Sequence, residues 1–296
     1  MDKEVRWERM FPDQLEAAFL ACPLVYFTYG LCEPHGPQNA IGLDELKAHR
    51  IACLAAQVHG GIVAPADFWH VHELGGYATW ADQYIGNVPR TWLTCMPPWM
   101  HFKNVLYHMR QADALGFQAA IFFTGHYGPN WEDLKRLIEL VQPSVGARLY
   151  GLPEFEANQP GYEGQSGDHA GKVETSLLWA LEPGCVDISR LPPEEQPGTP
   201  FAMGRDAYRA DRLVGERMVS DEVRFLGAKG RELLAEYSRL NPSQRLRTFA
   251  QVEAIWEDIV KPELPTFMSM QDSWDGAAPP ENSTWRENWK VPKVHY

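Results

Sequence analysis

The sequence predicts an α/β fold in which a mostly parallel sheet is flanked by helices. Short runs of apolar and β-branched residues alternate with longer segments whose apolar residues recur at helical spacing. Most of these segments end at a glycine or a proline. The 296 residues, 45% of them apolar, suffice for one large core. Because we find no internal repeat and no clean linker, we expect a single domain over residues 1–296.

The first third of the chain predicts a strand, a helix and a second strand. Residues 24–28 form an apolar run that a glycine stops, which is typical of a strand. A helix is expected over residues 43–58, where apolar residues recur at close to helical spacing, and a short strand over residues 62–64. Residues 67–99 are aromatic and show no clear periodicity. We expect them to form a long irregular insert, and such inserts are usually functional.

The middle of the chain continues the alternation. A helix is predicted over residues 102–115, and the run at residues 119–123 is typical of a strand that is buried on both faces. A second helix is predicted over residues 131–141 and the next strand over residues 147–150. A short helix follows over residues 173–181. These units add parallel strands to the same sheet.

The last third of the chain is less regular. Residues 190–200 contain four prolines and are expected to form a surface connection. A long helix is predicted over residues 206–237, although each of three glycines in it weakens it by roughly 1 kcal/mol relative to alanine. Residues 262–296 have no periodicity and contain three tryptophans, Trp274, Trp285 and Trp289. We expect this tail to pack on the same domain or on a neighbouring subunit, which makes it a candidate oligomer interface.

Charge and cysteine content exclude several classes of partner. The chain has 27 basic and 39 acidic residues and a formal net charge of −12, so its field repels nucleic acid and anionic membrane surfaces. The five cysteines are widely spaced and contain no C-x-x-C pair, which argues against a disulfide framework. We see no export signal and no apolar run of about 18 residues. We therefore expect a cytoplasmic protein.

Side chains that bind metals follow the predicted strands, where open α/β sheets bind their ligands. The loop after the first strand carries Glu33 and His35, and Asp44 follows at the start of the next helix. Oxygen and nitrogen donors on a loop shaped by glycine and proline suit a divalent metal. His126 stands in the loop after the strand at residues 119–123, at the same edge of a parallel sheet. The residues leave open the alternative that these are ordinary solvated loops.

A third polar segment lies at a predicted helix start. It contains Asp168, His169 and Glu174, which bring a histidine and carboxylates together. The alternative is structural, because a glutamate in the first turn stabilises the helix dipole and a histidine there is often a cap or a surface residue.

Taken together, the three segments resemble the motifs of the creatininase family of metal-dependent amidohydrolases. The family motifs are similar to E-x-H-G-P-H-x-x-x-G-x-D, N-G-H-G-G-N and H-A-G-x-x-E-T-S. Here they stand as E-P-H-G-P-Q-N-A-I-G-L-D at residues 33–44, T-G-H-Y-G-P-N at 124–130 and H-A-G-K-V-E-T-S at 169–176. Order and spacing agree over residues 20–182, and the resemblance implies a creatininase-like fold.

The resemblance implies two divalent metal ions per chain, with zinc expected first and manganese or iron as alternatives. Four residues match ligand positions of the family: Glu33, His35, Asp44 and His126. Asp44 would bridge the ions, and a hydroxide shared by them would be the nucleophile. Glu174 would be either the remaining ligand or an acid/base group.

The groups beside the metals are also assigned from the resemblance. His169 is the candidate for general acid/base catalysis or for oxyanion stabilisation, because a histidine can pass a proton to a leaving nitrogen near neutral pH. Asp168 would orient His169, and Tyr127 is expected in the substrate pocket.

Histidines and tryptophans of the insert are further pocket candidates. His70 and His72 form an H-x-H pair, which we place in the substrate pocket or in packing, with metal ligation as the rival reading. Four tryptophans could form a pocket wall or belong to the core: Trp69, Trp80, Trp92 and Trp99.

Four positions depart from the family motifs. Gln38 replaces a second histidine, Thr124 an asparagine and Pro129 a second glycine. Gly128 stands where creatininases proper have a glutamate. The departures leave a metal site in place and count against creatinine as the substrate.

The resulting hypothesis is an amidohydrolase that cleaves a C–N bond of a small amide or cyclic amide. The resemblance also implies a homo-oligomer, with a hexamer as one form. Two alternatives remain: a family offshoot that acts as a formamide deformylase or peptidase-like maturase, and a metal-binding module without catalysis. Motifs of serine hydrolases, P-loop NTPases and dinucleotide-binding enzymes are absent from the sequence.

Overall fold

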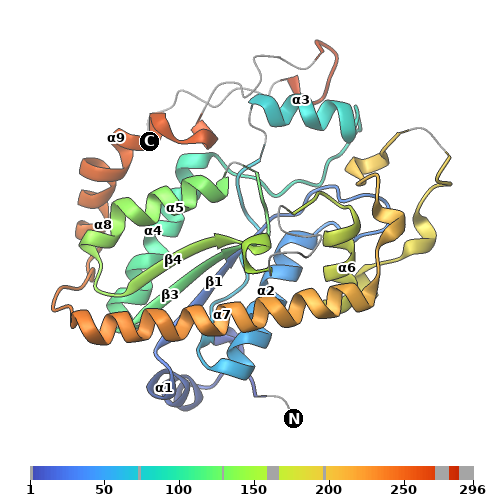
Figure 1. The fold of residues 1–296 in the computed structure, drawn as a ribbon. Coiled ribbons are helices and arrows are strands. Elements are labelled where there is room, and N and C mark those ends of the chain that lie inside the picture. The colour runs from blue at the N-terminus through green and yellow to red at the C-terminus, as the bar shows by residue number, and fades with distance from the viewer. Residues whose placement is uncertain are drawn as a thin grey trace.

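Four parallel strands form the sheet at the centre of the described part of the chain (Figure 1). The structure is a computed structural model that describes residues 3–72, 75–128, 130–158, 167–195, 198–270 and 280–286, with the backbone alone for residues 75–79 and 130. The strand order is β2-β1-β3-β4. The strands are β1 (Leu24–Tyr29), β2 (Ile62–Val63), β3 (Ala119–Thr124) and β4 (Arg148–Pro153).

Helices lie in the connections between the strands, and further helices precede β1 and follow β4. The α-helices are α1 (Pro12–Ala21), α2 (Leu43–His59), α3 (Gly75–Tyr84), α4 (Pro98–Leu115), α5 (Asn130–Val141), α6 (Lys172–Leu181), α7 (Arg212–Leu240), α8 (Phe249–Ile255) and α9 (Lys261–Glu263). A π-helical stretch, Trp256–Val260, joins the last two. Short 3-10 helices are η1 (Trp7–Arg9), η2 (Gln142–Ser144), η3 (Glu154–Ala157), η4 (Pro183–Cys185), η5 (Ile188–Arg190), η6 (Pro200–Ala202), η7 (Ala207–Arg209), η9 (Leu264–Thr266) and η10 (Met268–Met270).

The three long strands end at one level. Tyr29, the last residue of β1, pairs with Thr124 of β3, and Thr124 pairs with Pro153 of β4. The loops after these strands therefore leave the sheet at the same edge, which is where parallel sheets bind ligands.

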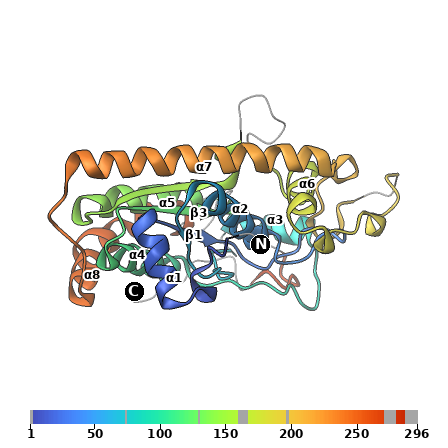
Figure 2. The same ribbon diagram turned by 90° about the horizontal axis from the view of Figure 1, so that it is seen from below.

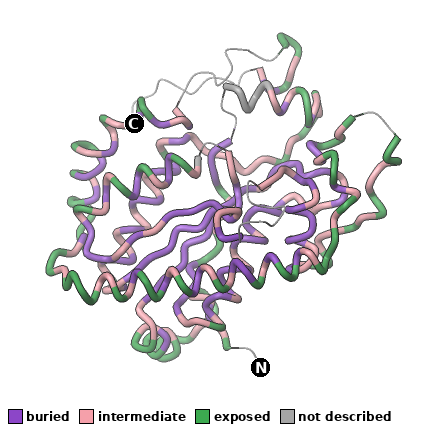
Figure 3. Tube along the Cα trace, in the orientation of Figure 1, coloured by how far each residue is buried: buried purple, intermediate pink, exposed green. Residues whose placement is uncertain are grey.

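The sheet is buried on both faces, as is usual for parallel sheets. Side chains of β1 alternate: Leu24 and Tyr26 belong to the core under α2 and α7, whereas Val25 and Phe27 belong to the core with α4 and α5. Figure 2 shows α7 along one side of the sheet and α4 and α8 on the other. In Figure 3 β1, β2 and β3 are buried along their length and β4 over most of its length, while α7 is exposed on its outer side. The predicted α/β class is confirmed.

The long helix α7 begins six residues later than the predicted residue 206. The Asp211 carboxylate caps it, because it accepts hydrogen bonds from the N–H groups of Leu213 and Val214 at 2.7 and 3.3 Å. The other aspartate, Asp206, is engaged elsewhere, since it accepts a hydrogen bond from the N–H of Lys172 at the start of α6. The sequence analysis placed the start of this helix near residue 206, whereas the structure places its N-cap at Asp211.

Two glycines of α7 lie where this helix touches α6 and α2. A Cβ at Gly215 would lie 1.9 Å from the carbonyl oxygen of Ser176 in α6, and a Cβ at Gly227 would lie 2.2 Å from the His59 ring at the end of α2. The helix therefore packs directly on α6 and α2 at these positions, which larger residues would prevent.

Helices also occur where none was predicted. The insert at residues 67–99, expected to be irregular, contains α3, and the N-terminal segment contains α1. Ala81 of α3 and Ile85, directly after the helix, are buried in one cluster with Ala202 and Trp285. Among the residues of α3 with described side chains, Ala81 alone is buried, so this helix has no broad apolar face that a pattern could reveal.

Described parts of the C-terminal tail pack on the same chain. Leu264 and Phe267 are buried in the core with α4 and α5, and Trp285 is 1% exposed. Trp274 and Trp289 lie outside the described residues, so the expected oligomer interface stays a prediction. The five cysteines are free, as predicted. Across the described ranges, no helix combines the length and apolarity needed to cross a membrane.

Candidate metal centre

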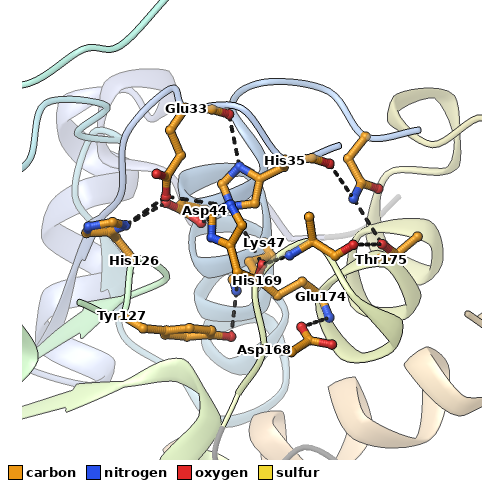
Figure 4. Close-up of polar contacts among 12 residues, drawn as sticks. Glu33, His35, Asp44, Lys47, His126, Tyr127, Asp168, His169, Glu174 and Thr175 are labelled. Atoms are coloured by element: carbon orange, nitrogen blue, oxygen red, sulfur yellow. Dashed lines mark hydrogen bonds and ion pairs between the residues drawn. The ribbon is translucent and has the colours of Figure 1, made fainter. Parts of the chain in front are cut away.

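Five ionisable side chains converge at the carboxyl edge of the sheet (Figure 4). Glu33 and His35 lie on the loop after β1, Asp44 in the first turn of α2, His126 after β3 and Glu174 in the first turn of α6. All five are buried. The three predicted segments, which are far apart in the sequence, therefore meet in one place.

Two glycines let the first turn of α2 approach the strand ends. A Cβ at Gly30, directly after β1, would lie 2.4 Å from the backbone nitrogen of Glu45. A Cβ at Gly125, directly after β3, would lie 2.1 Å from the carbonyl oxygen of Asp44. Asp44 is thereby fixed over the ends of two neighbouring strands.

The carboxylate of Asp44 faces two histidines with its two oxygens. Oδ1 lies 3.1 Å from Nε2 of His35, and Oδ2 lies 3.1 Å from Nδ1 of His126. Two groups with metal-ligating atoms within 4.8 Å of one another share this residue: Glu33 with Asp44 and His126, and His35 with Asp44 and Glu174. A third group joins Glu33, His35 and His169.

His35 presents its Nε2 to the carboxylates of Asp44 and Glu174. Its Nδ1–H donates to the carbonyl oxygen of Glu33 at 3.0 Å, which fixes the tautomer. Its Nε2 lies 3.1 Å from Asp44 and 3.6 Å from Glu174, and no hydrogen bond of the described residues satisfies it. A lone pair that faces carboxylates requires a proton or a cation between them, so this atom fits a metal ion.

Without a metal ion, protons on His35 and His126 would lie between the ring nitrogens and the carboxylates. Burial opposes charge on His35, but the carboxylates of Asp44, Glu174 and Glu33 outweigh burial and raise the pKa of His35 to about 9. Burial likewise opposes charge on His126, and Glu33 and Asp44 raise the pKa of His126 to about 10. Burial alone would raise the pKa of Glu33, but His126 and His72 lower that pKa well below its usual range.

Glu174 is held by groups that the sequence analysis did not identify. Its Oε1 accepts a hydrogen bond from Lys47 Nζ at 2.5 Å, and its Oε2 accepts one from the N–H of Ala170 at 2.8 Å. Lys47 lies on α2, one turn after Asp44, and is fully buried. Its ammonium also contacts Tyr127 and Glu154. Only the position of Lys47 on the inner face of the predicted helix could have indicated its burial.

The first and third motifs are bonded to each other. Gln38 donates from Nε2 to the carbonyl oxygen of Ala170 at 3.0 Å. Asn39 donates from Nδ2 to the carbonyl oxygen of His35 at 3.1 Å and to Oγ1 of Thr175 at 2.9 Å. Gln38, one of the four departures from the family motifs, thus helps to hold the start of α6 against the loop of His35.

His169 and Asp168 lie beside these clusters. The Nε2–H of His169 donates to the carbonyl oxygen of Pro34 at 3.0 Å, and its ring stacks on His35 with centroids 4.4 Å apart. The Asp168 carboxylate accepts hydrogen bonds from the N–H groups of Val173 and Glu174, which places it at the start of α6. Burial and the neighbouring Glu174 raise the pKa of Asp168 to about 7.

A cavity of about 400 Å³ opens over the clusters. The residues that line it are Glu33, Asp44, His72, Trp80, His126, Tyr127, Gly128, Asp168, His169 and Glu174. Trp80 is the member of the predicted tryptophan set that lines it, since Trp69 and Trp92 are exposed and Trp99 packs on the core. Its ring meets His169 edge to face at 4.9 Å.

The two histidines of the insert occupy different positions. Nε2 of His72 lies 3.0 Å from Oε2 of Glu33, and the His72 ring lies on the cavity wall. His70 is not among the described residues that line the cavity, because it lies behind His126 with ring centroids 5.2 Å apart. The ring centroids of Trp285 and His72 lie 6.1 Å apart. Trp285 also donates a hydrogen bond from Nε1 to the carbonyl oxygen of Gly86 at 3.2 Å.

The three motifs lie within a range that matches the model of a protein family. The model of the family Creatininase, described as creatinine amidohydrolase, matches residues 8–239. The chain belongs to the creatininase family. It is thereby a creatininase-family amidohydrolase, in a family of C–N hydrolases, and its buried clusters are compatible with a binuclear metal site.

Solved structures of creatininases share the fold of this creatininase-family chain. The structure described as Creatininase Mn is 21% identical with a TM-score of 0.62 and covers 78% of this chain and 98% of its own. A mutant creatininase of Zn-Zn type is 22% identical, with a TM-score of 0.60 and the same coverage. A mutant creatininase complexed with creatine is 20% identical, with a TM-score of 0.62 and coverage of 78% and 99%. A comparison with curated proteins gives no significant match.

Proposed function

We propose that this protein is a binuclear metal-dependent hydrolase that cleaves a C–N bond of a small amide or cyclic amide. The observation that carries the proposal is the arrangement of Asp44, whose two oxygens face two separate ligand groups. A carboxylate in this position suits a bridge between two cations. Family membership supports the reaction type, and creatinine itself is not assumed as the substrate.

The donor sets fit two divalent ions. Glu33, Asp44 and His126 would hold one ion, and His35, Asp44 and Glu174 the other. Their three carboxylates offset most of the charge of two dications. Carboxylate and imidazole donors accept zinc, manganese and iron, and relatives are described with manganese or with two zinc ions. When bound, the ions would activate a water molecule and stabilise negative charge that develops on the carbonyl oxygen.

The chain itself would supply proton transfer and the shape of the site. His169 keeps its proton on Nε2, toward Pro34, so Nδ1 is available to accept a proton and to pass it to the leaving nitrogen. Burial and the neighbouring His35 lower the pKa of His169, which keeps the ring neutral at pH 7. Tyr127 and Trp80 line the cavity, whose volume suits a small substrate.

Metal stoichiometry tests the proposal first. Elemental analysis of the purified protein should give about two ions per chain, and Asp44→Ala should lose both. Asp187→Ala is the matched control, because this exposed aspartate lies on a surface turn. The wild type is then assayed on amides, formamides and lactams.

The outcomes separate the alternatives. Two ions with turnover of an amide support the hydrolase, whereas turnover of formamides alone would favour a deformylase. Two ions without turnover on any of these compounds would favour a metal-binding module. No bound metal after reconstitution with zinc or manganese would overturn the proposal.

A further inference from the structure

A lysine is buried behind the candidate metal centre. Lys47 Nζ donates to Oε1 of Glu174 at 2.5 Å and to the hydroxyl of Tyr127 at 2.6 Å, and it lies 3.2 Å from Oε2 of Glu154. The side chains of Lys47 and Glu154 are fully buried. An ammonium has three N–H donors, so these three acceptors use all of them. Burial of such a charge is costly unless it is fully paired, and here it is.

The pairing makes the two oxygens of Glu174 unequal. Lys47 binds Oε1, on the side of the carboxylate away from His35. Oε2 accepts one hydrogen bond, from Ala170, and lies 3.6 Å from Nε2 of His35. Since a carboxylate oxygen has two lone pairs, Oε2 keeps one for the group of His35 and Asp44. Lys47 thereby decides which oxygen of Glu174 serves that group and in which orientation.

A second carboxyl group supports the lysine from behind. Glu154, at the end of β4, accepts a hydrogen bond from the Tyr127 hydroxyl and one from Nδ2 of Asn158 at 3.3 Å. Glu222 of α7 is buried against Glu154, and burial together with this neighbour raises the pKa of Glu222 well above its usual range. The raised pKa favours the neutral form of Glu222 in these buried surroundings.

The other group of ligands is held by different partners. Glu33 is contacted by His72, and the backbone around His126 is bonded to Thr124 Oγ1. Lys47 contacts neither Glu33 nor His126 among the described hydrogen bonds and ion pairs. Its influence should therefore fall on one subsite.

We propose that Lys47 is a positioning residue that fixes Glu174 and Tyr127 as one unit and so sets the affinity of the subsite formed by His35, Asp44 and Glu174. This inference rests on the proposed binuclear site. Partners that orient a metal ligand typically contribute about 10- to 100-fold in metal affinity. A lysine with a purely structural role would change the stability of the protein and leave the ratio of the two metal affinities unchanged.

Calorimetric titration of the metal-free full chain with zinc tests the inference. The wild type should bind two ions in two resolved steps. Lys47→Met should weaken one step about 10- to 100-fold and leave the other within about twofold. Glu174→Gln should weaken the same step, and adding Lys47→Met to Glu174→Gln should weaken it little further, because both changes act through one carboxylate. Lys103→Met is the control, since Lys103 pairs with Glu253 away from the cavity.

Folding of the variants is checked by circular dichroism. Lys47→Met leaves Glu154 buried without its cation, so the double variant Lys47→Met/Glu154→Gln removes both charges and should show the same selective loss. Two normal steps in these variants would overturn the inference and leave the proposed function standing. Equal weakening of both steps would also overturn it, because Lys47 would then act on the whole fold. A wild type that binds no ion would overturn the proposed function instead.

Discussion

Filling the two ligand groups with divalent ions should release about two protons per chain from histidines at pH 7, in addition to any proton lost by the activated water. In the metal-free protein His35 and His126 have pKa values of about 9 and about 10, so at pH 7 both rings are almost completely protonated. A metal ion binds neutral imidazole and must displace each proton. Glu33 and Asp44 contribute no proton, because their pKa values are lowered and both are already ionised.

The displaced protons determine how the metal affinity depends on pH. Raising the pH removes the competing protons, so metal affinity should rise with pH and level off above pH 10. Between pH 8 and pH 6 the product of the two association constants should fall about 100-fold for each pH unit, which is tenfold for each displaced proton.

Calorimetry in buffers of different ionisation enthalpy measures this release. The observed enthalpy, plotted against the ionisation enthalpy of the buffer, should have a slope that corresponds to about two histidine protons, and up to about one more from the activated water, for two zinc ions at pH 7. A slope near one would mean that only one of the histidines gives up a proton to a metal ion. A slope near zero, with two ions bound, would refute the reasoning altogether.

Further predictions concern stability, catalysis and backbone packing. The raised pKa values of His35 and His126 stabilise the metal-free protein fully below pH 6.5, so its free energy of unfolding, measured with urea, should fall as the pH rises through 9 and 10. His169→Ala should keep both ions in elemental analysis and lower kcat by about 10²- to 10⁴-fold; loss of the ions would instead make it a ligand. Asp113→Ala should lower the free energy of unfolding by roughly 3–5 kcal/mol in urea, because the buried carboxylate accepts hydrogen bonds from three backbone N–H groups and pairs with an arginine. Gly125→Ala should reduce metal content, since its Cβ would collide with the carbonyl oxygen of Asp44, and unchanged stoichiometry would contradict the role given to this close approach.

Much of the centre could be predicted because its ligands follow strands of one parallel sheet. Glu33, His35 and His126 stand in loops that directly follow β1 and β3, and the level strand ends bring these loops together. Local sequence therefore determined both the residue types and the edge at which they meet. The structure adds the separate orientation of the two Asp44 oxygens, which no spacing in the sequence indicates.

Features that depend on distant partners could not be predicted. Lys47 reads as an ordinary helical lysine until Glu174 and Glu154, more than 100 residues away, are placed against it. The helix α3 also depends on distant segments, because Ala81 packs with Ala202 and Trp285, and Trp80 meets His169. The spacing of apolar residues predicts a helix that buries a broad apolar face, and it does not predict one that buries few side chains.

Trp285 connects the C-terminal part of the chain to His72 on the cavity wall. The family match ends at residue 239, and every predicted ligand precedes that point. Trp285 lies well beyond it and supports His72, which forms part of the cavity wall. A chain shortened to the matched region would keep the predicted ligands and lose the contact between Trp285 and His72. The described part of the tail thus reaches the cavity wall through His72 and supplies none of the predicted ligands.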